Sequence, residues 1–225
     1  MKRQALISVL ILLAAGGRLV QTAQAAPPFR AGPAIPALAE RLRDGDSDVR
    51  QAAVHALGEL GPEGKAAIPA LALRLADPDR YVAVDASLVL SKMGSDATST
   101  VASMFQSPDP FVRELTARTL RLLGPDAKAA VPALAQRLWD PDASVRQAAV
   151  FALADIGPAA KAAIPALALR LRDPDRYVAS DAALTLGRMG PDSMPALLPL
   201  LRDYNPRVRE LAVRTFQQIG SEALR

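Results

Sequence analysis

Arginine, tyrosine and aspartate recur together in a seven-residue motif, DPDRYVA, which occurs at residues 77–83 and again at residues 173–179. An aspartate follows each copy two positions later, so a cation, a phenol and a carboxylate lie within about two turns of one helix. The groups concerned are Arg80, Tyr81 and Asp85, and Arg176, Tyr177 and Asp181. Neither copy places a nucleophile beside a general base, so the motif predicts a binding or structural role and no catalytic residue.

The single histidine does not predict a metal site. Glu59 follows His55 by four residues, so both side chains would share one helical face. The chain has no cysteine and no second histidine to complete a set of ligands. It also has no glycine-rich phosphate loop, and we therefore expect no metal and no cofactor.

The N-terminal residues have the order of a secretory signal peptide. Lys2 and Arg3 precede an apolar run over residues 5–15, and a small-residue triplet ends at Ala25. We expect cleavage after Ala25, a linker over residues 26–32, and a periplasmic or secreted product. The apolar run is short for a membrane span, so no stable membrane insertion is expected after cleavage; an uncleaved anchor is the alternative.

The charge balance argues against nucleic acid as a partner. The leader contains Lys2, Arg3 and Arg18, and without these three the 27 basic residues become 24, against 23 acidic ones. A nearly neutral chain with interspersed signs lacks the basic footprint that nucleic acids require. Because it has no cysteine, the exported chain must be held together by packing alone.

An internal repeat positions these residues. A marker valine recurs at steps of 33, 30, 33, 33 and 30 residues, at Val49, Val82, Val112, Val145, Val178 and Val208. Periods of this size are typical of solenoids, in which each unit buries its apolar face on its neighbours. Each unit is expected to hold a short first helix, an Asp-Pro-Asp turn that caps the next helix, and a second helix that ends at glycine.

The repeat resembles the HEAT repeat family, in the short bacterial form also found in phycobilin lyases. The resemblance covers about residues 33–223 and rests on the pattern D-x-D-x-x-V-R-x-x-A-x-x-A-L-G-x-x-G, which begins at Asp44 and ends at Gly61. Residues 140–157 follow it with Ala154 in place of a glycine. It implies an all-α, right-handed α-solenoid of about six two-helix HEAT-like repeats, with an armadillo-like helical arrangement and the role of a binding scaffold.

A larger duplication lies over the repeat. Residues 35–129 align without a gap on residues 131–225, and roughly half of the positions are identical. The repeat domain, over residues 33–225, is therefore expected to be a three-repeat block copied once, with blocks at 35–130 and 131–225.

The resemblance also implies a buried ladder of hydrogen bonds between repeats. In the family the ladder joins an aspartate and an arginine that lies six residues later, directly after the marker valine. The groups kept in this chain are Asp44/Arg50, Asp140/Arg146 and Asp203/Arg209, with Arg113 opposite Ser107 in the third repeat.

The two DPDRYVA repeats depart from that pattern, because Ala83 and Ala179 replace the arginine. Asp85 and Asp181 should flank the core stripe, where an unpaired carboxylate is costly. We expect each to face an arginine of a neighbouring repeat, and the candidates for Asp85 are Arg50 and Arg113. The Arg-Tyr pairs are either binding sites on one edge of the solenoid or part of a rewired ladder with each tyrosine packed on the next repeat, and we favour the second interpretation.

A partner-binding groove is predicted on the second helices. The position six residues after each marker valine should point into it, and these positions hold His55, Leu88, Arg118, Phe151, Leu184 and Arg214. Apolar residues with two arginines suit an extended peptide or a partner helix. The alternative is a tightly curled face whose residues cover one another. Trp139, the only tryptophan, is either an exposed anchor or packed on the preceding helix.

Together these features predict an exported, non-catalytic and monomeric scaffold that binds a protein partner. The family resemblance suggests an accessory or chromophore-lyase-like role as the alternative, and nucleic-acid binding ranks below both.

Overall fold

The computed structural model describes residues 31–222 of the chain. Every regular element in that range is an α-helix or a 3-10 helix, and none of these residues is in a strand. The all-α prediction is thereby confirmed for the described range. The signal peptide and its cleavage point lie outside it, and helix α2 begins at Ala31, inside the stretch expected to be a linker.

The chain divides into two compact units, residues 1–104 and residues 105–225. Their boundary lies between Met104 and Phe105, whereas the duplication places the block boundary after residue 130. The two boundaries differ because sequence identity records which segment was copied, while the units record where packing is dense.

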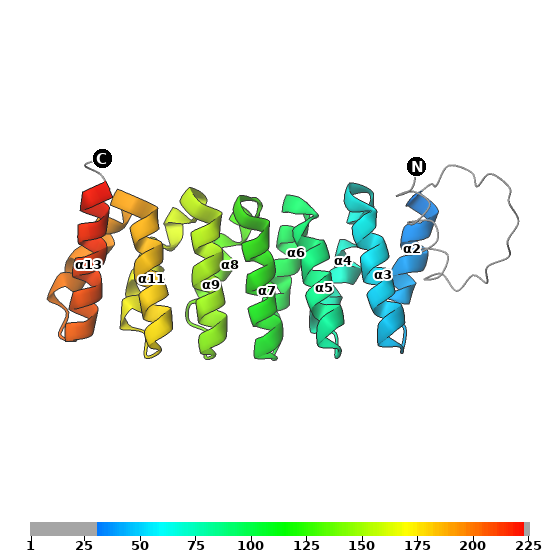
Figure 1. Ribbon diagram of the computed structural model, residues 1–225, viewed down its shortest axis with the longest axis horizontal. Helices are drawn as coiled ribbons and strands as arrows, with labels where there is room; N and C mark the ends of the chain where they lie inside the picture. Colours follow the sequence, from blue (N-terminus) through cyan, green and yellow to red (C-terminus); the bar gives the residue numbers. More distant parts are fainter. Residues whose placement is uncertain (1–30, 223–225) are drawn as a thin grey trace, which may run out of the picture. The chain divides into compact units, whose positions relative to one another are not determined.

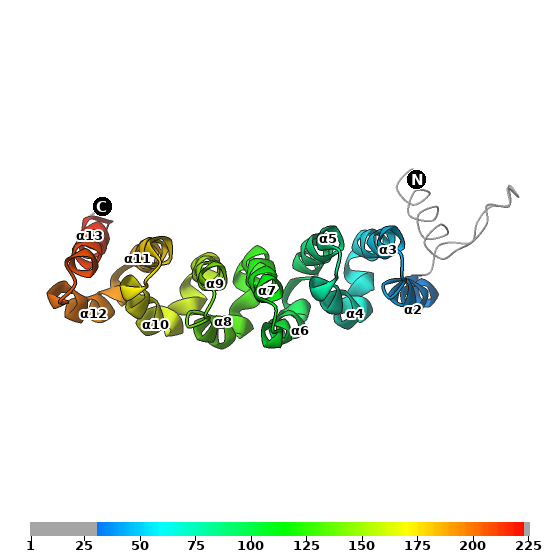
Figure 2. The same cartoon turned by 90° about the horizontal axis from the view of Figure 1, so that it is seen from below.

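Unit 1 has two layers of helices (Figures 1 and 2). The second helices, α3 (Ser47–Glu59) and α5 (Arg80–Ser91), form one layer. The other layer contains α2 (Ala31–Arg41), α4 (Ile68–Leu73) and α6 (Thr98–Ser103). The 3-10 helices η1 (Gly61–Ala67), η2 (Arg74–Ala76) and η3 (Gly94–Ala97) connect them, and η4 (Met104–Gln106) follows α6.

Unit 2 has the same two-layer arrangement. Its second helices are α7 (Pro110–Leu123), α9 (Ala143–Ile156), α11 (Arg176–Met189) and α13 (Pro206–Glu222). Its first helices are α8 (Val131–Arg137), α10 (Ile164–Leu169) and α12 (Met194–Leu197). The 3-10 helices between them are η5 (Gly124–Ala130), η6 (Gly157–Ala163), η7 (Arg170–Arg172), η8 (Gly190–Ser193) and η9 (Leu198–Arg202).

Each marker valine lies in a second helix, and all except the half-buried Val49 are buried. Small residues such as Ala53 and Ala149, which are fully buried, accompany the valines on the same faces. Alanine adds little bulk, so neighbouring second helices can approach closely, as α7 and α9 do in unit 2.

The predicted turn and cap chemistry is confirmed in both DPDRYVA copies. Asp79 accepts a hydrogen bond from the Tyr81 amide at 2.8 Å, and Asp175 accepts one from the Tyr177 amide at the same distance. Such caps satisfy amides that a helix start leaves without a partner. The glycine after α9, Gly157, has a φ of 72° and a ψ of −138°, a backbone conformation that glycine adopts readily, and the chain leaves the helix there.

One stretch of unit 2, Ala143–Arg172, is long and apolar enough by composition to cross a membrane, with a mean hydropathy of 1.4. Half of it is buried, and Gly157 breaks its helix. Many of its apolar residues, such as Val145, Leu153 and Leu167, therefore belong to the core of unit 2.

Candidate functional site

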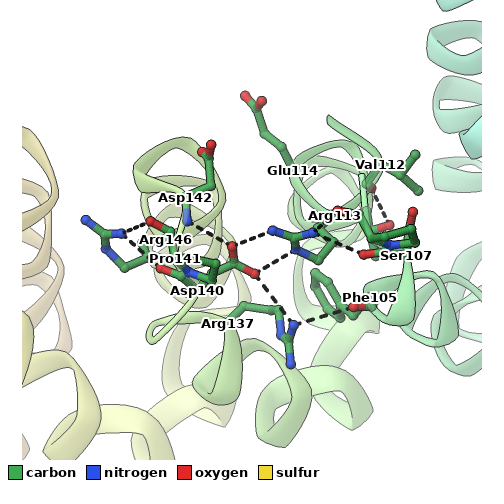
Figure 3. Close-up of polar contacts among 12 residues, drawn as sticks. Phe105, Ser107, Val112, Arg113, Glu114, Arg137, Asp140, Pro141, Asp142 and Arg146 are labelled. Carbon is green, nitrogen blue, oxygen red and sulfur yellow. Dashed lines mark hydrogen bonds and ion pairs between the residues drawn. The ribbon is translucent and has the colours of Figure 1, made fainter. Parts of the chain in front are cut away.

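Three buried arginines join successive second helices to the turns that follow them. Arg50 donates from Nε and Nη2 to the Asp77 carboxylate at 2.9 and 2.7 Å. Arg113 binds Asp140 in the same two-bond geometry at 2.8 Å each (Figure 3). Arg146 binds Asp173 in this way at 2.9 and 2.8 Å. Each pair spans 27 residues, so the ladder that the family resemblance implies is present at these three steps.

The partners within the ladder differ from the expected ones. The residue six positions before each arginine contributes its backbone carbonyl. Nη1 of Arg50 and of Arg146 donates to the carbonyls of Asp44 and Asp140 at 2.9 Å, and Nη1 of Arg113 donates to that of Ser107 at 3.1 Å. The carboxylate comes from the turn of the next repeat. Asp77 and Asp173, each the first residue of a DPDRYVA copy, were not predicted as ladder residues.

These bonds change the acidity of the buried carboxylates. Burial by itself raises the pKa of Asp77, but the hydrogen bonds from Arg50 and from the Asp79 amide outweigh it, so the pKa lies below its usual value. The pKa of Asp140 is lowered against the same burial effect by Arg113 and the Asp142 amide. Both groups are therefore held as carboxylates at neutral pH.

The ladder has a variant between α11 and α13. Ala179 supplies no guanidinium there, and Arg172 of η7 instead donates from Nε to Asp203 at 2.6 Å. Arg209 donates from Nη1 to the carbonyls of Asp203 and Tyr204 at 2.8 and 3.0 Å, as the other ladder arginines do to theirs. No carboxylate among the described residues binds the rest of its guanidinium.

The predicted arginine partners of the two extra aspartates are wrong. Asp85 accepts from Gln51 Nε2 at 2.6 Å and lies 2.8 Å from His55 Nε2, and Asp181 accepts from Gln147 Nε2 at 2.7 Å. Arg50 cannot serve Asp85, because Asp77 and two carbonyls occupy its donors. A half-exposed carboxylate does not need a guanidinium, and an amide donor is sufficient.

The Arg-Tyr pairs also differ from the favoured interpretation. Tyr81 is 79% exposed and Tyr177 57% exposed, so neither ring is packed on a following repeat. Arg176 donates to the Tyr177 hydroxyl at 2.6 Å and lies over its ring, 4.7 Å from the centroid. Trp139 is 56% exposed, and the Arg170 guanidinium stacks on it at 3.7 Å from the ring centroid.

The predicted partner-binding positions are accessible in both units. In unit 1, His55 and Leu88 are exposed. In unit 2, Leu184 is 53% exposed, Arg118 and Arg214 are exposed, and Phe151 is half-buried. We call these four residues of unit 2 the second-helix face.

A hollow of about 460 Å³ lies between α7 and α9 and brings together Arg118 and Phe151. Leu122 and Ala148 add apolar walls, and the hollow is lined further by Glu114, Arg121, Ser144, Gln147 and Asp155. Leu184 and Arg214 do not line this hollow.

The charged groups of the hollow are already paired. Arg121 donates to Asp155 at 2.7 Å and lies over the Phe151 ring at 5.0 Å, and Ser144 donates to Glu114 at 3.0 Å. Arg118 forms an ion pair with Glu114, and 62% of its side chain is exposed. An aliphatic or aromatic side chain can therefore lie against Phe151 and Leu122, while Arg118 can exchange its acid for a carboxylate of a ligand.

The family model for HEAT repeats matches residues 20–83, 68–154 and 164–225. The chain belongs to the HEAT repeat family. A second model, for the PBS lyase HEAT-like repeat, matches residues 145–173. Among curated proteins no relative matches.

Solved structures with the same fold are only distantly similar in sequence. An engineered protein is 22% identical with a TM-score of 0.53, covering 83% of this chain and 96% of its own. A computationally designed armadillo repeat protein for modular peptide recognition is 17% identical with a TM-score of 0.51, covering 82% and 99%. The complex of CpcE and CpcF of phycocyanin lyase from Nostoc sp. PCC7120 is 24% identical with a TM-score of 0.51, covering 91% and 82%.

The polar half of the hollow in this HEAT repeat chain was not predicted from its sequence. Glu114, Arg121 and Asp155 were not predicted to contribute to a site. A signal was present, because Arg121 and Asp155 lie 34 residues apart, the same separation as the Gln51–Asp85 bond of unit 1. Among the described residues no cluster of three or more His, Asp or Glu side chains has metal-binding geometry.

Proposed function

We propose that this chain is an exported, non-catalytic scaffold whose second-helix face in unit 2 binds an extended segment of a partner protein. The observation that carries the proposal is the hollow between α7 and α9, which joins the predicted contact residues Arg118 and Phe151. The segment places an apolar side chain against Phe151 and a nearby carboxylate against Arg118. The likeness to a designed peptide-recognising repeat protein supports this reading of the fold.

The half-exposed state of the apolar residues fits such a role. Phe151 is half-buried, and Leu184 on α11 is 53% exposed although it lies on a packed helix. Burying such side chains on binding gains about 1.5 to 3 kcal/mol for each that becomes fully covered. The surrounding charges already satisfy one another, so they form a polar rim that orients a ligand.

The test is a pull-down from the exported fraction with the full chain as bait, repeated with the Phe151→Asp/Leu184→Asp variant. Specific partners should be recovered by the native chain and lost with the variant, because a charge on this face opposes burial of the ligand. The matched control is Leu198→Asp, a residue with the same 53% exposure on the first-helix side of unit 2. Recovery of the same partners by all three proteins would remove the second-helix face from consideration.

The chemistry of the ligand has its own test. A displayed library of random peptides selected on the chain should converge on an apolar residue near an acidic one. Selection that is unchanged by Arg118→Ala contradicts the carboxylate contact, and selection unchanged by Phe151→Asp contradicts the apolar one.

A second candidate, an accessory role of the chromophore-lyase type, is supported by the PBS lyase HEAT-like match over residues 145–173 and by the likeness to the CpcE and CpcF complex. The pull-down distinguishes the two candidates, because this role requires a chromophore-binding protein among the recovered partners.

Export is tested by the N-terminal sequence of the secreted material. It should begin at Ala26, and a full-length product that stays inside the cell contradicts export.

A further inference from the structure

The three turns that precede α9, α11 and α13 lie along one edge of unit 2 (Figure 1). Contacts join them, since Arg170 of the second turn stacks on Trp139 of the first and Arg172 of the second binds Asp203 of the third. Each turn, taken with the first two residues of the helix that follows, presents one exposed aromatic ring to solvent: Trp139 at 56%, Tyr177 at 57% and Tyr204 at 89%. We call this set of turns the aromatic edge.

The exposed charges of the aromatic edge are all positive. Asp140, Asp173 and Asp203 are buried in ladder bonds, and Asp142 and Asp175 are half-buried helix caps. The exposed cations are Arg172, Arg176, Arg202 and Arg207. The carboxylates of these turns are thus engaged in ladder bonds and helix caps, whereas these arginines remain exposed.

The corresponding turns of unit 1 do not share this character. Tyr81 is exposed there, but so are Asp46 and Asp48 in the turn before α3. Position 76, which corresponds to Trp139 and Arg172, is an alanine. The combination of exposed rings with Arg176, Arg202 and Arg207, which bind no carboxylate among the described residues, is a property of unit 2.

We propose that the aromatic edge binds the surface of an anionic lipid bilayer. Tyrosine and tryptophan favour the headgroup level of a membrane, where the ring is partly covered and its polar atom stays wet. Arginine pairs with lipid phosphates, and each cation near an anionic surface contributes about 1 kcal/mol. The three rings project outward from successive turns, and this row of protruding side chains fits a flat surface better than a ligand that must be enclosed.

The mode of binding is peripheral. Only side chains of the turns reach the headgroups, since the apolar residues behind them are core residues of unit 2. The aromatic edge is formed by the turns and by the first residues of the helices that follow them, whereas the proposed protein-binding face is formed by positions further along helices α7 to α13. Lipid binding and partner binding therefore use different residues.

Trp139 provides a direct probe, because it is the only tryptophan of the chain and lies in the aromatic edge. The full chain is titrated with vesicles of equal parts phosphatidylcholine and phosphatidylglycerol, and with vesicles of phosphatidylcholine alone. The apolar stretch over residues 5–15 can partition into lipid by itself, so the readout is the emission of Trp139 rather than attachment of the chain. We expect a shift to shorter wavelength with the anionic vesicles only, and its reversal by high salt.

The decisive variant is Arg202→Glu/Arg207→Glu, which should weaken the Trp139 response by roughly tenfold or more. Its matched control, Lys128→Glu/Lys161→Glu, changes the net charge equally but lies in η5 and η6, at the opposite edge of unit 2 (Figure 1). The control should respond like the native chain. Unchanged thermal unfolding of both variants shows that folding is not the cause.

Three results would overturn the proposal: an equal response to neutral vesicles, an equal loss in the two variants, or no response at all. A single-stranded oligonucleotide is titrated in parallel, because exposed rings and arginines can also stack on bases. A response to it at lower concentration than to anionic lipid overturns the proposal in favour of nucleic acid. Phe151→Asp should leave the lipid response unchanged, so failure of the proposed protein-binding function can be distinguished from failure of lipid binding.

Discussion

Arg113 is buried in unit 2 and binds four acceptors: both carboxylate oxygens of Asp140 and the carbonyls of Ser107 and Pro108. Arg113→Ala leaves Asp140 buried with Arg137, which is 3.5 Å away, and one amide donor. Loss of one partner from a buried pair costs about 3 to 5 kcal/mol, and because Arg137 remains we expect about 3 kcal/mol.

Urea unfolding of the two chains measures that difference. The control is Arg118→Ala, which removes an exposed arginine from the same helix and should change the stability by less than about 0.5 kcal/mol. Equal effects of the two substitutions contradict the assignment of Arg113 to the ladder.

Acid should destabilise the fold through the same carboxylates. Asp77 and Asp140 have a pKa below the usual value in the folded chain, so the unfolded chain takes up their protons first as the pH falls. Their contribution is complete at neutral pH and is lost between about pH 5 and pH 2. The thermal midpoint should fall over this range, and it should fall less in Asp77→Asn, whose midpoint at neutral pH is already lower. Asp96→Asn, in an exposed pair with Lys65, should keep the native slope.

The ladder arginines could be located from sequence, because each directly follows a marker valine. Their acceptors could not. A carboxylate 27 residues away is one of several aspartates in an Asp-Pro-Asp turn, and only packing decides which is buried. The hollow could not be predicted from sequence either, because Arg121 and Asp155 come together only where α7 packs against α9.

Helix α9 ends at a position that only glycine occupies without strain. Gly157 has a φ of 72°, and a β-carbon added there would meet no atom within 4 Å. The cost of Gly157→Ala is therefore backbone strain alone, about 1 to 3 kcal/mol. Gly45→Ala is the control, because its added β-carbon also meets nothing and its φ lies outside the left-handed region. Thermal unfolding should distinguish the two, and an equal shift contradicts this account.

Most second helices were predictable as elements, because an aspartate cap, an apolar stripe and a terminal glycine coincide in them; α13 differs, since Asn205 caps it and Gly220 lies inside it. The first helices were only partly predictable. Proline at the start of α4, α8, α10 and α12 permits a first helical turn, but several of these elements are six residues or shorter and run into 3-10 helix. Short segments of this kind take their form from packing on a neighbour rather than from propensity.

The two units make a prediction at the level of the whole chain. Residues 105–225 contain α7 and its Arg113–Asp140 bond, whereas the sequence block over residues 131–225 lacks both. The fragment 105–225 should therefore fold cooperatively and melt at a higher temperature than the fragment 131–225. Circular dichroism during heating compares them, and an equal or reversed order shows that the block is the folding unit.

The unit boundary could not be predicted from the duplication, yet the sequence marks it in another way. Position 83 has alanine where a ladder arginine is usual, and position 107 has serine where the acid is usual. The step from position 83 to position 107 therefore lacks both ladder groups. The alignment of the two blocks does not reveal this, because Ala83 matches Ala179 in the second block, whereas Ser107 matches Asp203, which is an acid.

Arg209 in α13 is a ladder arginine that could bind the turn of a further repeat. Its Nη1 holds two carbonyls, and its remaining donors have no carboxylate among the described residues, in the state that Arg113 would have without Asp140. Residues 131–222 begin with a helix pair that supplies such a carboxylate. Joining a copy of residues 130–222 directly after Arg225 would place Asp140 of the added copy 27 residues after Arg209, the separation of the three ladder pairs, so that the scaffold can be lengthened in whole modules with the same joint.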